Sequence, residues 1–213
     1  MTEHTFEQSR EQSAVQTSER VLAFWFGRGD NAIEIAESQS SLWWGKDERV
    51  DAEIAATFAA TARAVADGGL DHWADSPRGL LALIIATDQL PRNIHRDTPA
   101  AFACDATALR LAKHGVASGA SQQLRAIERV FAYLPFEHSE ALADQQRSVA
   151  LYQQLADAAA PEEAGLFDNY LDFAHKHHDI IVRFDRFPHR NQILGRESTD
   201  AELAFLEQPG SSF

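Results

Sequence analysis

The segment from Arg78 to Leu90 constrains the fold most, because it is apolar on almost every side when it is drawn as a helix. A helix with no polar face has to be buried among other elements. Ser76 and Pro77 favour a helix start at this point, and Pro91 is expected to end the helix. Asp88 falls in the last turn, where an isolated carboxylate would be costly to bury. We therefore expect Asp88 to be buried and bonded to an arginine or to backbone N–H groups.

The rest of the chain shows the same helical period. In the segment 47–66, apolar side chains recur at steps of three and four residues, which is typical of an amphipathic helix. No run of alternating apolar and polar residues indicates a sheet. Further helices are predicted over 18–26, 98–114, 121–135, 139–159, 161–186 and 199–206, while 28–41 reads as irregular. The predicted fold class is all-α, with about seven or eight helices in an antiparallel helical bundle or a short α-solenoid.

Length and polarity set the expected domain limits. A chain of 213 residues suits one domain, and we predict a single all-α domain over 17–207. Residues 1–16 are polar without a period and are expected to form a flexible N-terminal tail, and 208–213 a C-terminal tail.

Charge and cysteine content narrow the classes of partner. Lys and Arg number 19 against 32 Asp and Glu, which gives a formal net charge of -13. Such a field disfavours nucleic acid and anionic membranes as partners. Cys104 is the single cysteine, and no secretory signal precedes the first helix, so we expect a cytoplasmic protein. No apolar run is long enough to cross a bilayer.

Against this negative charge, the segment Arg183–Arg196 carries four arginines, a histidine and an asparagine. The stretch Asp88–Arg96 looks like a shorter copy, since both contain a proline followed by Arg-Asn. Helix starts at Thr98 and Ser198 follow the two turns, and free N–H groups at a helix start favour anions. We expect the two turns to lie close together and form one cleft for an anion. The predicted ligand-binding residues are Arg92, Arg96, Arg183, Arg186, His189, Arg190 and Asn191.

The same arginines also admit a structural interpretation. Guanidinium groups at helix ends commonly bond to the last carbonyls of the helix or pair with nearby acids. Asp88, Asp179 and Asp185 are acids within reach in the sequence. Both roles can coexist, with different arginines in each.

Two histidines are candidates for proton transfer. His138 lies in the turn Glu137–Glu140 after Pro135, where a carboxylate could orient it as a general acid or base. His175 is followed at i+4 by Asp179, a spacing that lets the two side chains meet on one helix. The alternative for His138 is a packing role beside Ser139, which would cap the next helix. We predict no metal site, because the chain has no HExxH motif and no set of cysteines. Whether a cofactor is bound is left open.

Several of these motifs together resemble a known family. They are Phe24–Phe26, Trp43-Trp44, Leu81–Ile94, Leu134–Glu140, Arg183–Asn191 and Gly195–Thr199. In them the chain resembles the bacterial domain of unknown function 924 family, and the resemblance spans nearly all of it except the tails. It implies a tetratricopeptide-repeat-like all-α fold and a cluster of polar residues, but no settled activity. The chain departs at Asp185, where glycine is expected, and at Trp44, where phenylalanine is usual.

The residues themselves favour one function and leave an alternative open. We expect binding of a small anionic metabolite in a cleft lined by arginine and histidine, where a histidine could add acid–base chemistry. Whether the chain is an enzyme is left open. The alternative is a non-catalytic helical-repeat interaction module that binds a peptide carboxylate or a protein partner. A third interpretation is a polar network that binds no ligand.

Overall fold

The computed structural model describes residues 15–29 and 31–211, and it divides the chain into two compact units where the sequence predicts one domain. The first unit runs to Arg96 and includes Ala100–Pro135, and the second contains 97–99 and everything after Pro135. Most of the predicted N-terminal tail lies outside the described residues. Gln16, at its end, is held to the first unit because its N–H donates to Thr61 Oγ1 at 2.8 Å.

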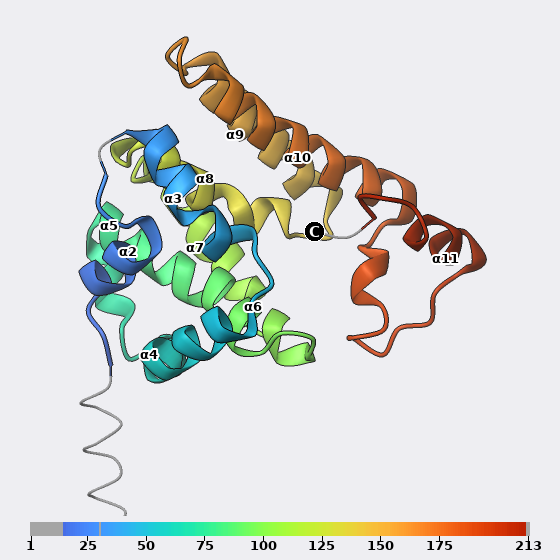
Figure 1. Ribbon diagram of the computed structural model, residues 1–213, viewed down its shortest axis with the longest axis horizontal. Helices are drawn as coiled ribbons and strands as arrows, with labels where there is room; N and C mark the ends of the chain where they lie inside the picture. Colours follow the sequence, from blue (N-terminus) through green and yellow to red (C-terminus); the bar gives the residue numbers. More distant parts are fainter. Residues whose placement is uncertain (1–14, 30, 212–213) are drawn as a thin grey trace, which may run out of the picture. The chain divides into compact units, whose positions relative to one another are not determined.

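The described residues are helical and contain no strand, which confirms the all-α prediction (Figure 1). None of the helices in this part of the chain combines the length and the apolar character needed to cross a membrane. The α-helices of the first unit are α2 (Ser18–Phe26), α3 (Ala32–Trp44), α4 (Glu48–Ala66), α5 (Pro77–Ile84), α6 (Leu90–Ile94), α7 (Asp105–Ala117) and most of α8 (Ala126–Glu137). Short 3₁₀ turns lie at Asp71–Asp75, Pro99–Phe102 and Ser121–Gln123, and a π-helical segment at Ile85–Gln89.

Helix α5 forms the centre of the first unit, as the apolar segment predicts. It contacts α2 and α7, and all its residues from Gly79 to Ile84 are buried. An aromatic cluster adds to this core, with the Phe131 ring 4.6 Å from Trp43 and 5.4 Å from Phe26. Trp43 belongs to α3, so the expectation of irregular structure over 28–41 was wrong. Asn31 caps α3 by accepting from the Ile33 N–H at 2.8 Å, a start signal that the weak apolar period of this segment hides.

The central helix does not end at Pro91, contrary to the sequence expectation. It continues through the π-helical segment, where the Leu90 N–H donates to the Ile85 carbonyl five residues back. Pro91 then occupies the first turn of α6, where its missing N–H costs no helical bond. Asp88 lies in the π-helical segment and is fully buried. Its carboxylate accepts from Gln89 Nε2 at 2.6 Å and lies 3.5 Å from Arg92 Nη1, which confirms the prediction for Asp88.

The second unit is built on two neighbouring long helices, α9 (Leu142–Asp157) and α10 (Ala164–Phe184), joined by a short connection and therefore antiparallel (Figure 1). The 3₁₀ turn Pro188–Arg190 and the short helix α11 (Asp200–Leu206) follow. Ile180, Ile181 and Phe187 form a buried cluster, and Phe184 and Phe205 pack against it. This cluster supports the segment that carries the predicted basic residues.

The C-terminal ends of α8 and α10 differ from what the sequence predicts or from what the family resemblance implies. Helix α8 runs through Pro135 to Glu137, so the prediction that it stops at Pro135 was wrong. The side chain of the buried Gln145 satisfies its end, because Nε2 donates to the carbonyls of Glu137 and Ser139 at 2.6 Å each. Helix α10 ends at Asp185, whose φ of 56° is left-handed. Glycine reaches this region without strain, which explains why the family resemblance implies glycine at this position.

Candidate ligand-binding site

The site lies in the second unit, where the turn after α8 meets the segment between α10 and α11. Gln145 holds the turn through its bonds to Glu137 and Ser139. The Ser139 hydroxyl donates to Asp144 Oδ2 at 2.9 Å and accepts from the Ala141 N–H at 3.2 Å. This turn therefore presents His138 and Glu140 on a fixed backbone.

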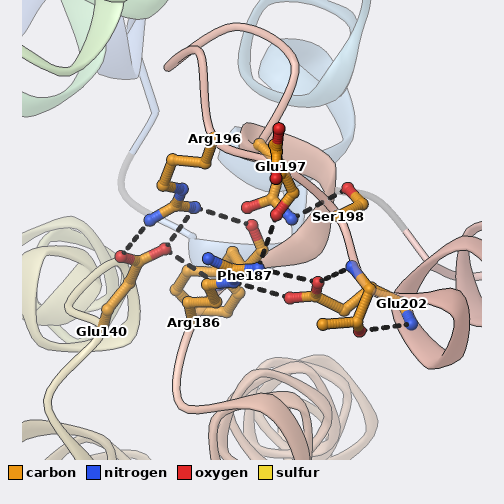
Figure 2. A network of polar contacts seen from close by, with 9 residues as sticks. Glu140, Arg186, Phe187, Arg196, Glu197, Ser198 and Glu202 are labelled. Atoms are coloured by element: carbon orange, nitrogen blue, oxygen red, sulfur yellow. Dashed lines mark hydrogen bonds and ion pairs between the residues drawn. The ribbon is translucent and has the colours of Figure 1, made fainter.

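Glu140 and Arg196 form the first ion pair of the site (Figure 2). Arg196 donates from Nη1 to Glu140 Oε2 at 2.7 Å and from Nη2 to Oε1 at 3.0 Å. The Phe187 N–H also donates to Glu140 Oε1 at 2.8 Å, and Arg196 Nη2 donates to the Phe187 carbonyl at 3.1 Å. Burial raises the pKa of Glu140, but the bonds from Arg196 and Phe187 outweigh it, so the net pKa is lowered. The pair fixes the guanidinium against the backbone of Phe187.

Arg186 and Glu202 form the second ion pair, which Figure 2 also shows. Arg186 donates from Nε to Glu202 Oε1 at 2.6 Å and from Nη2 to Oε2 at 2.8 Å. Glu202 also accepts from the Thr199 N–H at 2.7 Å, while Thr199 Oγ1 accepts from the Glu202 N–H at 3.3 Å. These two bonds are the capping box that the sequence predicts at the start of α11. Arg186 thus anchors α11 and is committed to an internal acid.

Arg190 and Asn191 are buried side chains of the same segment. Arg190 donates from Nη1 to the His138 carbonyl at 3.0 Å, and its guanidinium lies 4.5 Å from the centre of the Phe187 ring. Asn191 donates from Nδ2 to Ser198 Oγ at 3.0 Å. The structure therefore brings His138, Arg190 and Asn191 into one cluster with the two ion pairs.

His177 is the buried histidine of α10, and the sequence analysis missed it. Its Nδ1 lies 2.9 Å from the Phe173 carbonyl and 3.0 Å from Glu137 Oε1, and its ring centre is 6.4 Å from that of His138. Burial lowers the pKa of His177 to about 3, and neighbouring positive groups add to the effect, so the imidazole is neutral at physiological pH.

His175, the predicted catalytic residue of this helix, is exposed instead. The buried face of α10 is centred on Ala174, His177 and Ile181, and a residue two positions before His177 is turned about 200° away from it. The i, i+4 spacing of His175 and Asp179 carried no information about which face packs inward. His177 would have been found by extending the apolar face by one residue.

A pocket of about 680 Å³ opens beside the Glu140–Arg196 pair. Its lining comes from the segment between α10 and α11 and from α11 itself. The lining residues are Pro188, His189, Gln192, Arg196, Glu197, Ser198, Leu203 and Leu206. One predicted ligand-binding residue, His189, is among them, and Arg190 and Asn191 follow it directly in the chain. Arg196, singled out with the basic segment, also lines the pocket.

The other predicted ligand-binding arginines do not line this pocket. Arg92 and Arg96 belong to the first unit, where they pair with Asp105 at 2.8 Å and with Asp51 at 2.5 Å respectively. Arg183 is exposed and lies over the rings of Phe184 and Phe205, at 4.6 and 5.5 Å. Arg92, Arg96 and Arg186 are thus paired with internal acids, and their binding of a ligand stays a prediction. Within the described residues, no group of His, Cys, Asp or Glu has the arrangement needed to hold a metal ion.

Comparison with known proteins gives a family match but no activity. A family model described as bacterial protein of unknown function (DUF924) matches residues 21–210. A solved structure of a protein of unknown function from Agrobacterium tumefaciens is similar to this chain, with 34% sequence identity and a TM-score of 0.76. The similarity covers 90% of this chain and 97% of that one. No curated protein matches the chain.

Proposed function

This chain belongs to the bacterial DUF924 family, and we propose that it binds a small anionic metabolite in the pocket beside Arg196. The observation that carries the proposal is the pocket itself. Its volume of about 680 Å³ suits a small molecule, and the polar part of its wall consists of an arginine, a histidine, a glutamine, a serine and the acid Glu197. The cysteine content of the chain leads us to propose the cytoplasm as the place of this binding.

Arg196 is prepared for an anion by its bonds to Glu140 and Phe187. Of its five N–H groups, three are used in these bonds, the Nε–H is buried, and the second N–H of Nη1 donates no bond within the described residues. A guanidinium that is already held in place loses little freedom when a ligand arrives. The ligand would therefore meet a fixed donor surface.

The charge of the cluster is close to balance. Three arginines, Arg186, Arg190 and Arg196, stand against four glutamates, Glu137, Glu140, Glu197 and Glu202, so the negative groups exceed the positive ones by one before any histidine is counted. Of the histidines in this cluster, His189 lines the pocket. We propose His189 as the group that would exchange a proton with a ligand, in place of the exposed His175, with His138 at the neighbouring turn.

The proposal is tested by thermal unfolding in the presence of phosphate, citrate or butyrate, each compared with chloride at equal ionic strength. At least one anion should raise the Tm as its concentration passes its Kd, because a ligand that binds the folded state stabilises it. Gln192→Glu should weaken this effect strongly, since it adds a second carboxylate to a pocket wall that already carries Glu197.

Gln154→Glu is the matched control, because Gln154 is exposed on α9 and does not line the pocket. It makes the same change of charge in the same unit, and it should leave the response to the anion intact. If no anion stabilises the protein beyond chloride, the proposed function is wrong. An equal loss of response in both variants would place the anion elsewhere.

A second candidate function is an interaction module, and exposed apolar side chains favour it. The second unit exposes Leu142, Phe173, Val182, Leu194 and Leu203. If this function is the right one, peptides with a free C-terminal carboxylate should stabilise the protein and their amidated forms should not. Small anions would then have no effect.

A further inference from the structure

We propose that the ligand of this pocket carries a single acid group and an apolar chain or ring. This inference rests on the proposed function and names the class of molecule that the same pocket would take. The inference is based on three features of the pocket lining: an apolar part, a part with hydrogen-bond donors, and one acidic side chain.

The apolar wall comes from α11 and the turn before it. Leu203 and Leu206 are three residues apart, so they lie on the same side of the helix. The neighbouring Glu202 bonds to Arg186, and Phe205 packs against Phe184 at 5.1 Å, which fixes the rotation of α11. Leu203 is left 52% exposed at the pocket, where a fully polar anion would not cover it. An apolar group seated there would remove this leucine from water.

The polar wall offers donors for one carboxylate. Ser198 Oγ accepts from Asn191 Nδ2, and no hydrogen bond donated by this hydroxyl occurs within the described residues. Arg196 Nη1 gives one of its two N–H groups to Glu140, and no bond from the second occurs in the same part of the chain. A carboxylate can accept a bond from both donors, and the bond from the guanidinium is the stronger because both groups are charged.

Glu197 limits the ligand to one negative group. Its exposed side chain also lines the pocket, and Arg196 is the one arginine or lysine among the lining residues. A second carboxylate or a phosphate on the ligand would meet Glu197 without a further cation to offset it. We therefore infer a monocarboxylic acid with an apolar part.

Titration calorimetry with butanoate, hexanoate and octanoate, each below its micelle concentration, tests this inference. The Kd should fall about two- to fourfold for each added methylene, the upper value being that of a fully buried methylene. Hexylamine, which has the same chain and the opposite charge, should not bind.

Two variants test whether the ligand's apolar chain contacts the pocket leucine or any exposed apolar side chain. Leu203→Ser should flatten the dependence of Kd on chain length while leaving butanoate binding almost unchanged. Val182→Ser is the matched control, because Val182 is 57% exposed on α10 and does not line the pocket. Both substitutions replace exposed side chains, so both proteins should fold, which circular dichroism checks.

The outcomes distinguish the inference from the proposed function. If butanoate binds but longer acids bind no more tightly, the ligand class is wrong and the proposed function stands. An unchanged chain-length dependence in Leu203→Ser also overturns the ligand class. If no acid binds, or if hexylamine binds as tightly as hexanoate, the proposed function fails as well.

Discussion

Asp185 shows how a single residue can carry strain at the edge of the site. It ends α10 with a φ of 56°, a left-handed conformation in which a Cβ atom is unfavourable. Aspartate tolerates this region better than most residues, but glycine occupies it without cost. The next residue, Arg186, anchors α11, so the strain lies directly before a structural ion pair.

Asp185→Gly should therefore raise the free energy of unfolding by about 0.5–1 kcal/mol, because it removes this strain at the C-terminal cap. Urea unfolding measures the change. Asp172→Gly is the control, since Asp172 is an exposed position inside the same helix and pairs with Lys176 at 2.6 Å. There glycine should lower the stability by several tenths of a kcal/mol. Destabilisation by Asp185→Gly would contradict the assigned strain.

The arginines of the site fall into two groups, those that bond to a carboxylate and one that bonds to a backbone carbonyl. Arg186 and Arg196 hold acids with two-point geometry, while Arg190 donates to a carbonyl and stacks on Phe187. Two-point pairs hold both partners in one orientation, which lysine could not reproduce. The arginine-rich segment therefore holds α11 and the turn at Glu140 in place through ion pairs. The pocket lies beside these ion pairs.

At the scale of elements, α11 depends on one carboxylate. Glu202 completes the capping box of this seven-residue helix and receives both bonds from Arg186. An isolated helix of this length would not be stable in water. Its place therefore rests on Glu202 and on the contact of Phe205 with Phe184.

Glu202 makes the attachment of α11 dependent on pH. Hydrogen bonds from Arg186, with smaller ones from Thr199, lower the pKa of Glu202 to about 2 from an ordinary value of 4.5. The folded state thus binds this proton more weakly than the unfolded state. The carboxylate stabilises the fold above about pH 4.5, and this contribution is lost as the pH falls from 4.5 towards 2.

Glu202→Gln should accordingly have a lower free energy of unfolding than the unsubstituted protein at pH 6. This gap between the two free energies should narrow as the pH falls towards 2. Urea unfolding of both proteins between pH 2.5 and 7 measures it. Glu207→Gln, at an exposed position just after α11, should show no such gap at any pH. A gap for Glu202→Gln that stays constant across the range would show that its charge does not contribute.

For the whole molecule, charge is the dominant long-range property. A formal net charge of -13 on 213 residues repels itself in the folded state. Raising NaCl from low concentration to 0.2 M should screen this repulsion and increase the Tm, with each kcal/mol corresponding to about 2–4 °C. At pH 5, near the sequence pI of 5.0, the increase should shrink. A Tm that falls with salt at pH 7 would mean that ion pairs outweigh the repulsion.

The sequence alone determined the fold class and its centre. The period of apolar residues identified α4, α5 and α10, and the capping box identified α11, because these signals depend only on neighbours along the chain. The sequence also predicted that Asp88 is buried, because every side of the apolar helix that carries it packs against other elements. The resemblance to the DUF924 family was confirmed over residues 21–210.

Tertiary structure decided which partner each polar side chain meets. Arg196 bonds to Glu140 and Arg186 to Glu202, at separations of 56 and 16 residues that no local pattern encodes. Packing against the rest of the second unit also set the rotation of α10, which buries His177 and exposes His175. The helices run through Pro91 and Pro135 for a similar reason. A π-helical segment precedes Pro91, and after Pro135 the Gln145 side chain bonds to the carbonyl of Glu137, the last residue of α8. The bond from Gln145 is a contact that only the fold supplies.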